Sequence, residues 1–121
     1  MPKQAIEYLR HIKDECDFVI SSVDILKTKE DFITDEILKR AVVRSLEIIG
    51  EATKKIPADI KVKWSEITWK NMAGMRDRLI HDYMGINYNI VWDVAKNKIP
   101  ELLEQITQVI DKEEQTTGNK I

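Results

Sequence analysis

Cysteine, glycine, proline and long apolar runs are all scarce in this sequence. Its only cysteine, Cys16, excludes an intrachain disulfide and a zinc site built from thiolates, and we expect its side chain to be a small buried hydrophobe. Four glycines and three prolines in 121 residues are few for the turns of an all-β domain. No apolar run approaches the roughly 18 residues of a transmembrane helix, and the first residues lack the apolar core of a signal peptide. A helical protein of the cytoplasm is therefore expected.

An excess of positive charge is also missing. The net charge is −2 and the pI is near 5.7, whereas domains that coat nucleic acid nonspecifically usually carry a strong basic excess. Any contact with RNA must therefore be local. The two histidines, His11 and His81, are 70 residues apart and form no credible ligand set, so we expect no metal and no cofactor. His11 lies at helical spacing from Glu7 and Glu15 and is expected at the surface.

What the sequence does contain is helical periodicity. Its length fits one domain, and 43% hydrophobic with 33% charged residues is typical of a helical globule. Apolar residues recur at steps of three and four, which is the period of an amphipathic helix. The prediction is an all-α, antiparallel four- to five-helix bundle with one domain over residues 1–113, a polar flexible tail at 114–121, and helices up to about residue 27, over 34–55 and 69–83, and from about 89.

Capping and breaking residues set the expected helix ends. Thr34, followed by two acidic residues, is expected to cap the second helix after a polar break at 27–31, and Pro57 ends that helix. Gly85 and the asparagines around it predict a loop before the last helix. Pro100 removes one backbone donor and should kink or restart that helix.

Tryptophans and lysines flank the middle of the chain. We expect Trp64, Ile67 and Trp69 to anchor the irregular crossing at 57–69 to the core. Trp69 and Trp92 fall within apolar stripes, which favours packing over a base-stacking platform. A further group of basic residues has two equally compatible interpretations, a solvated face or a rim that guides RNA. Its members are Lys54, Lys55, Lys61, Lys63 and Lys70.

The segment 75–83 holds the densest chemistry in the chain. Asp77 precedes His81 by one helical turn, so its carboxylate can accept an imidazole proton and raise the basicity of the other ring nitrogen. Arg78 is three residues before His81, whereas Arg76 is five before it and about 140° round an ideal helix. A target shared by Arg76 and His81 therefore requires either unwinding near Tyr83 or two chains that meet at their motifs.

The pattern Arg-x4-His-x-Tyr, here Arg76, His81 and Tyr83, resembles the signature of HEPN domains, specifically the HepT-like toxins paired with minimal nucleotidyltransferases. The resemblance extends to Ile48–Ala52, Trp64, Gly74–Arg76, Gly85–Asn87 and Val91–Trp92, and so covers most of the chain. It implies a homodimer that places two motifs at the bottom of one cleft.

The resemblance also implies a function. We expect a metal-independent endoribonuclease toxin of a toxin–antitoxin pair that cleaves transfer or messenger RNA, with His81 as base or acid and Arg76 as phosphate clamp. Asp77 as orienting group and Arg78 as electrostatic helper follow from spacing. Tyr83 matches the hydroxyl to which the nucleotidyltransferase antitoxin attaches AMP, which would block the cleft by charge and bulk.

Two other interpretations stay open. The helical dimer could be a non-catalytic docking subunit for the nucleotidyltransferase, with Arg76 and His81 dispensable. The motif could also be an ion-paired surface, in which Arg76, Asp77, Arg78 and Asp82 pair with one another and the Tyr83 ring caps the core.

Overall fold

All regular elements of the described chain are helical, which confirms the all-α prediction. The computed structural model describes residues 3–79 and 85–118. Its elements are α1 (Lys3–Asp24), α2 (Lys29–Thr34), α3 (Glu36–Lys54), α4 (Ala58–Lys63), α5 (Trp69–Ala73), α6 (Met75–Leu79), α7 (Tyr88–Asp93), the π-helix η2 (Val94–Lys98) and α8 (Ile99–Gly118). Within these residues no helix combines the length and the apolar composition needed to cross a bilayer.

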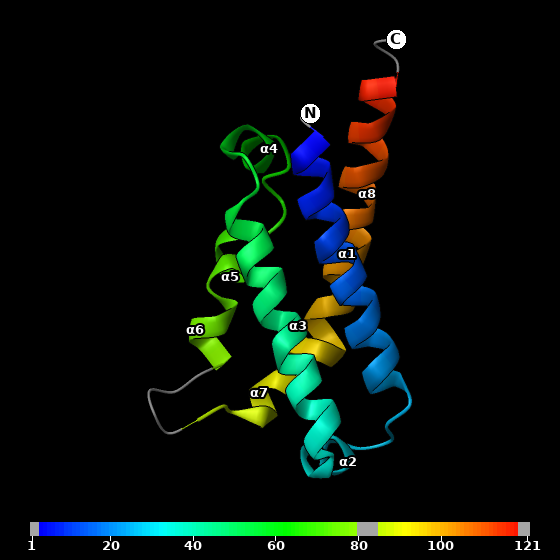
Figure 1. The fold of residues 1–121 in the computed structure, drawn as a ribbon, viewed down its shortest axis with the longest axis vertical. Helices are drawn as coiled ribbons and strands as arrows, with labels where there is room; N and C mark the ends of the chain where they lie inside the picture. Colours follow the sequence, from blue (N-terminus) through cyan, green and yellow to red (C-terminus); the bar gives the residue numbers. More distant parts are fainter. Residues whose placement is uncertain (1–2, 80–84, 119–121) are drawn as a thin grey trace.

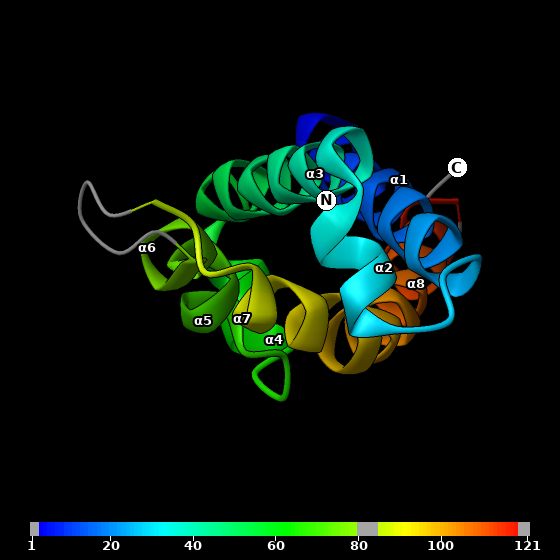
Figure 2. The same ribbon diagram turned by 90° about the horizontal axis from the view of Figure 1, so that it is seen from below.

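The helices form an antiparallel bundle (Figure 1). The long helix α1 packs against both α3 and α8. On the other side of α3 lie α5 and α6, which together run in the direction opposite to α3. Seen along the bundle, α1 and α8 lie on one side of α3, and α5 and α6 lie on the other (Figure 2). The chain thus makes four passes, and α2, α4 and α7 lie at the turns between them.

Apolar stripes on the long helices explain this packing. The innermost side chains of α1 are completely buried, and they include Leu9, Ile12 and Val19. Burying each such side chain contributes about 1.5–3 kcal/mol relative to leaving it exposed. Cys16 lies in the same stripe with no exposed surface, which confirms its predicted role as a small hydrophobe. Burial, together with the neighbouring charges of Asp17 and Glu15, raises the pKa of the Cys16 thiol to about 12.

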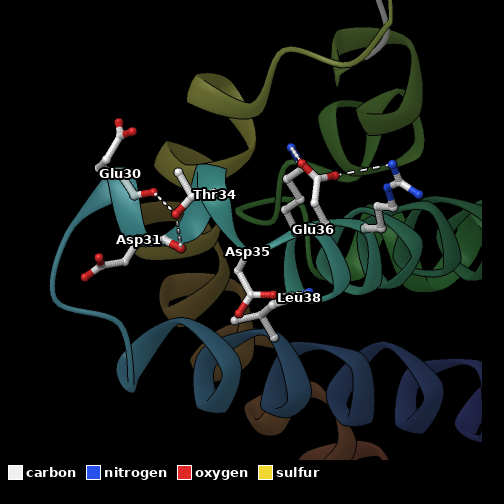
Figure 3. Close-up of polar contacts among 8 residues, drawn as sticks. Glu30, Asp31, Thr34, Asp35, Glu36 and Leu38 are labelled. Atoms are coloured by element: carbon white, nitrogen blue, oxygen red, sulfur yellow. Dashed lines mark hydrogen bonds and ion pairs between the residues drawn. The ribbon is translucent and has the colours of Figure 1, made fainter.

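The corner between α2 and α3 differs from the prediction. Thr34 was expected to cap the second long helix, but its hydroxyl donates instead to the carbonyl oxygens of Glu30 and Asp31, within α2 (Figure 3). The residue that caps α3 is Asp35, whose carboxylate accepts from the backbone N–H of Leu38 at 2.9 Å. The prediction was therefore wrong by one residue, since either side chain can cap a helix.

The polar run 27–31 was expected to be a break and instead contains the start of α2. The Thr28 hydroxyl oxygen accepts from the backbone N–H of Asp31 and caps the new helix. Phe32 is completely buried, with its ring centroid 5.5 Å from that of Trp92 and 6.5 Å from that of Tyr88. One buried aromatic side chain gives no periodic signal in a sequence, so pattern reasoning could not find this helix.

The predicted helix over 69–83 is interrupted. Its described part consists of α5 and α6, and Gly74 caps the end of α5 through N–H bonds to the carbonyls of Lys70 and Met72. A second glycine, Gly50, lets α3 approach this segment closely: a Cβ atom at Gly50 would lie 3.2 Å from the backbone oxygen of Met72. α5 is thus seated directly on α3, and α6, which carries the described part of the motif, also contacts α3.

A π-helix precedes Pro100, near the predicted kink. The N–H of Ile99 donates to the carbonyl of Val94, which inserts the extra residue of a π-turn between α7 and α8. Ala95, in the same turn, is completely buried. The helix therefore restarts one residue before the proline, as expected from its missing N–H.

The last helix extends to Gly118, past residue 113, where we placed the domain boundary. Glu113 is only 3% exposed and accepts a hydrogen bond from the Trp64 indole N–H at 2.9 Å. Its carboxylate also pairs with the Lys63 ammonium at 2.8 Å, and Glu114 pairs with Arg10 of α1. These contacts tie the end of α8 to α1, to the last residue of α4 and to Trp64, which follows it.

Candidate functional site

The described part of the candidate motif lies on α6, at the edge of the bundle. Met75 and Leu79 are buried, one helical turn apart, and they hold the helix against α3 and α7. The three residues between them, Arg76, Asp77 and Arg78, are exposed. α6 therefore presents all its charged side chains to solvent.

The two arginines point to different sides of α6. At 100° per residue, Arg76 and Arg78 lie about 160° apart, one on each side of the buried edge, and Asp77 points outward between them. Arg78 lies beside the groove toward η2 and α8, because it lines a cavity there. The two arginines of one α6 helix therefore start from opposite sides of that helix.

Neither arginine forms an ion pair within residues 3–79 and 85–118, and the same holds for Asp77. Other exposed arginines do form such pairs: Arg10 with Glu114, Arg40 with Glu36 and Arg44 with Glu47. Any ion-pair partner of the two guanidinium groups of α6 therefore lies outside the described residues.

Three residues of the motif, His81, Asp82 and Tyr83, lie outside the described residues. The pairing of Asp77 with His81 and the role of Tyr83 therefore stay predictions. The described structure does fix the two points between which the motif segment runs. The backbone N–H of Asn87 donates to the carbonyl oxygen of Leu79 at 3.0 Å, so the end of α6 and the start of α7 are joined.

Gly85 and Asn87 shape the return of the chain to this point. Gly85 has a φ of +100°, in the left-handed region that favours glycine. The side-chain oxygen of Asn87 accepts from the backbone N–H groups of Asn89 at 3.1 Å and Ile90 at 3.3 Å, and so caps α7. The predicted helix start near Asn89 is thus one residue late, since α7 begins at Tyr88.

A cavity of about 150 Å³ opens between the α5–α6 pair on one side and η2 with α8 on the other. Apolar side chains from both sides form its walls: Met72, Met75, Leu79, Val94, Ile99 and Leu102. Asn71 and Gln105 are among its polar lining residues, as are the cations Arg78 and Lys98. Sequence reasoning missed this cavity because its two walls lie far apart in the chain, and each wall alone looks like an ordinary helix face.

The aromatic and basic residues singled out by the sequence have mostly structural contacts. Trp69 is 7% exposed and donates its indole N–H to the Trp64 carbonyl at 3.0 Å, which confirms packing and anchoring. Trp92 is half-buried against the ring of Phe32, as also expected. In the lysine group, Lys63 pairs with Glu113 and Lys54 pairs with Glu51.

His11 is exposed, as predicted. In the part of the chain that the structure describes, no group of three His, Cys, Asp or Glu residues is placed to hold a metal ion. Among the described charged residues of α6, Arg78 is the one that lines the cavity.

Comparisons with known proteins agree on one family. A family model described as "Ribonuclease HepT-like" matches residues 5–109. The protein named "Putative RNase TTE0752", from Caldanaerobacter subterraneus subsp. tengcongensis, is 50% identical over 106 residues, which cover 88% of this chain and 94% of that protein. "Putative RNase MJ0127" of Methanocaldococcus jannaschii is 40% identical over 126 residues and the full length of both chains.

A third relative, "Probable ribonuclease HepT" of Thermococcus cleftensis, is 51% identical over 73 residues, which cover 60% of this chain and 66% of that protein. No solved structure matches the chain. The matched residues of the family model extend from α1 into α8 and include the whole of segment 75–83.

Proposed function

This chain belongs to the HepT-like ribonuclease family, and we propose that it is a metal-independent endoribonuclease in which Arg76 holds a phosphate of RNA and His81 moves the proton. The observation that carries the proposal is the ion pairing of the two arginines of α6. This helix presents two guanidinium groups with no ion-pair partner among the described residues, in the segment that leads directly to His81. Such groups are suited to hold a phosphate, because they stay charged at any working pH.

The proposed reaction is an internal transfer at phosphorus. The ribose 2′-oxygen attacks the adjacent phosphorus and gives its proton to the imidazole of His81, while the bond from phosphorus to the 5′-oxygen breaks. The leaving 5′-oxygen takes a proton from water and the imidazolium of His81 gives its proton back to water, so the products carry a 2′,3′-cyclic phosphate and a 5′-hydroxyl. Arg76 stabilises the negative charge that builds on the phosphoryl oxygens.

A homodimer would supply the cations that one chain lacks. The net charge of −2 gives little long-range attraction for RNA. Because Arg76 and Arg78 lie about 160° apart on their short helix, a phosphate beside one of them is remote from the other. A second motif facing the first would place further guanidinium groups around the same phosphate, which supports the shared cleft.

We extend the proposal to regulation and substrate. The protein would act as the toxin of a toxin–antitoxin pair, cleave transfer or messenger RNA, and be inhibited when a nucleotidyltransferase antitoxin attaches AMP to Tyr83. The added phosphodiester would bring negative charge and a nucleoside next to His81 in the sequence. Support for this extension comes from the Arg-x4-His-x-Tyr pattern itself.

The test is incubation of the purified protein with total transfer RNA in the presence of a chelator, followed by denaturing electrophoresis. We expect the parent to cleave the RNA. The cleavage rate of His81→Ala should be about a hundredfold or more lower, the usual scale for a general acid or base. Arg76→Lys keeps the charge but loses the planar fork, so it should also be impaired.

Arg40→Lys is the matched control, because Arg40 is an exposed arginine already paired with Glu36 on α3. Intact mass must first show that Tyr83 carries no AMP. Equal cleavage by the parent and His81→Ala would contradict the proposal. A folded parent without activity would favour the docking-subunit interpretation.

A further inference from the structure

The cavity beside α6 has a composition unlike that of a simple packing gap. Each of its two walls contributes apolar side chains to a mixed lining, and Met72 and Met75 are among them. Methionine side chains adapt to flat ligands and make favourable contacts between sulfur and an aromatic ring. Its volume of about 150 Å³ suits a single six-membered ring, since an engineered apolar cavity of roughly this size binds benzene.

The polar lining groups add a second requirement. Asn71 and Gln105 carry amides, each of which both donates and accepts hydrogen bonds. Within residues 3–79 and 85–118 neither side chain forms a hydrogen bond with another protein group. A flat ring with donors and acceptors along its edge would find hydrogen-bond partners in these two amides.

The charged residues at the cavity narrow the choice of ligand class further. Arg78 and Lys98 are exposed cations among the lining residues, but Glu66 and Glu101 are there too. The balanced charge disfavours a free, multiply charged anion inside the cavity. It suits an uncharged ring whose attached phosphate stays outside, beside Arg78.

We propose that this cavity binds one unstacked pyrimidine base of an RNA strand whose neighbouring phosphate is held by the motif. The inference rests on the proposed ribonuclease function, because Arg78 belongs both to the cavity and to α6. A base in the cavity would fix the register of the strand, and so the site acts as a determinant of sequence preference.

The first experiment measures binding without cleavage. Only four methionines are present in the chain, so methyl-labelled methionine gives a simple NMR spectrum, and Met72→Leu and Met75→Leu assign the two cavity signals. The probe is a 2′-O-methyl oligouridylate, which cannot supply the attacking hydroxyl. We expect the signals of Met72 and Met75 to shift on titration, and a 2′-O-methyl oligoadenylate to bind more weakly.

A matched pair of variants tests whether the base binds in this cavity. Asn71 is exposed and lines the cavity, so Asn71→Trp should fill its mouth with little effect on folding. Asn97 is also an exposed asparagine on a helix, but it does not line the cavity. We expect Asn71→Trp to weaken oligouridylate binding about tenfold or more, the scale of one lost stacked base, and Asn97→Trp to bind as the parent does.

The outcomes separate this inference from the proposed function. If transfer RNA is cleaved but the two methionine signals do not move, the cavity inference fails and the ribonuclease proposal stands. If the signals move but no RNA is cleaved, the base site stands and the ribonuclease proposal fails. Equal or tighter binding of oligoadenylate overturns the pyrimidine preference. If light scattering shows that Asn71→Trp breaks a dimer while oligouridylate binding is unchanged, the cavity is a subunit contact and the inference is wrong.

Discussion

At the scale of single residues, backbone conformation matters as much as side-chain chemistry. Gly85 carries no side chain and yet fixes how the chain approaches α7, because its φ of +100° is one that other L-residues rarely adopt. A Cβ atom added there would meet nothing within 4 Å among the described residues. The requirement for glycine is thus one of backbone conformation and not of space.

We therefore predict that Gly85→Ala lowers the free energy of unfolding by about 1–2 kcal/mol, the cost of the left-handed region for a residue with a Cβ atom. Urea titration followed by circular dichroism measures this change. Gly85→Asn is the control, because asparagine tolerates the left-handed region better and should lose less. Equal losses in both variants would contradict a purely conformational cause.

At the scale of elements, the ends of helices depend on which side chain reaches the orphan N–H groups. Asp35 and Thr34 are neighbours, and both residue types can cap a helix, yet only Asp35 caps α3. Thr34 is directed back into α2, where its hydroxyl donates to carbonyl oxygens of the preceding turn. The burial of Phe32 accompanies this choice, since it holds α2 against α7.

This difference gives a direct test. Asp35→Ala should lower the free energy of unfolding by about 1 kcal/mol, the usual loss for an N-cap, and also remove a favourable charge at the helix start. Thr34→Ala should change it by less than about 0.5 kcal/mol, as expected for an exposed site. Chemical denaturation of the two variants beside the parent decides the matter. A larger loss of unfolding free energy in Thr34→Ala than in Asp35→Ala would support the sequence-based prediction that Thr34 is the cap.

At the scale of the whole molecule, the far end of α8 is fastened to the rest of the bundle through a buried acid. Burial raises the pKa of the Glu113 carboxyl, but hydrogen bonds from Lys63 and Trp64 and the Lys63 charge outweigh this and hold the pKa below its ordinary value of 4.5. The charged form is therefore favoured by folding. Its contribution to stability is complete above the unfolded pKa and is lost as the pH falls through the folded pKa.

We predict that Glu113→Gln is less stable than the parent at neutral pH and that the gap narrows in acid. The difference in free energy of unfolding should be constant from neutral pH down to about pH 5 and should shrink below it, as the parent's Glu113 becomes protonated. Urea titrations at a series of pH values measure the gap. An exposed acid on the same helix, Glu104→Gln, is the control. A gap that does not depend on pH would show that the charge of Glu113 is not the cause.

The sequence by itself determined the all-α class, the approximate limits of the long helices and the place of the Arg76 to Tyr83 motif. These features are local, because a repeat of three and four residues or a spacing of five can be read without knowing what packs nearby. Cys16 and Trp69 were predicted correctly as packing residues for the same reason, since each lies in an apolar stripe.

Only the tertiary structure decided which distant segments meet. The indole of Trp64 and the carboxylate of Glu113 are 49 residues apart in the chain, and the sequence around Glu113 reads as a polar tail. The cavity likewise needs Met72 and Met75 on one wall and Leu102 on the other. A pattern on one helix shows which face is apolar but not which face of another helix will lie opposite, because burial is a property of the packed pair.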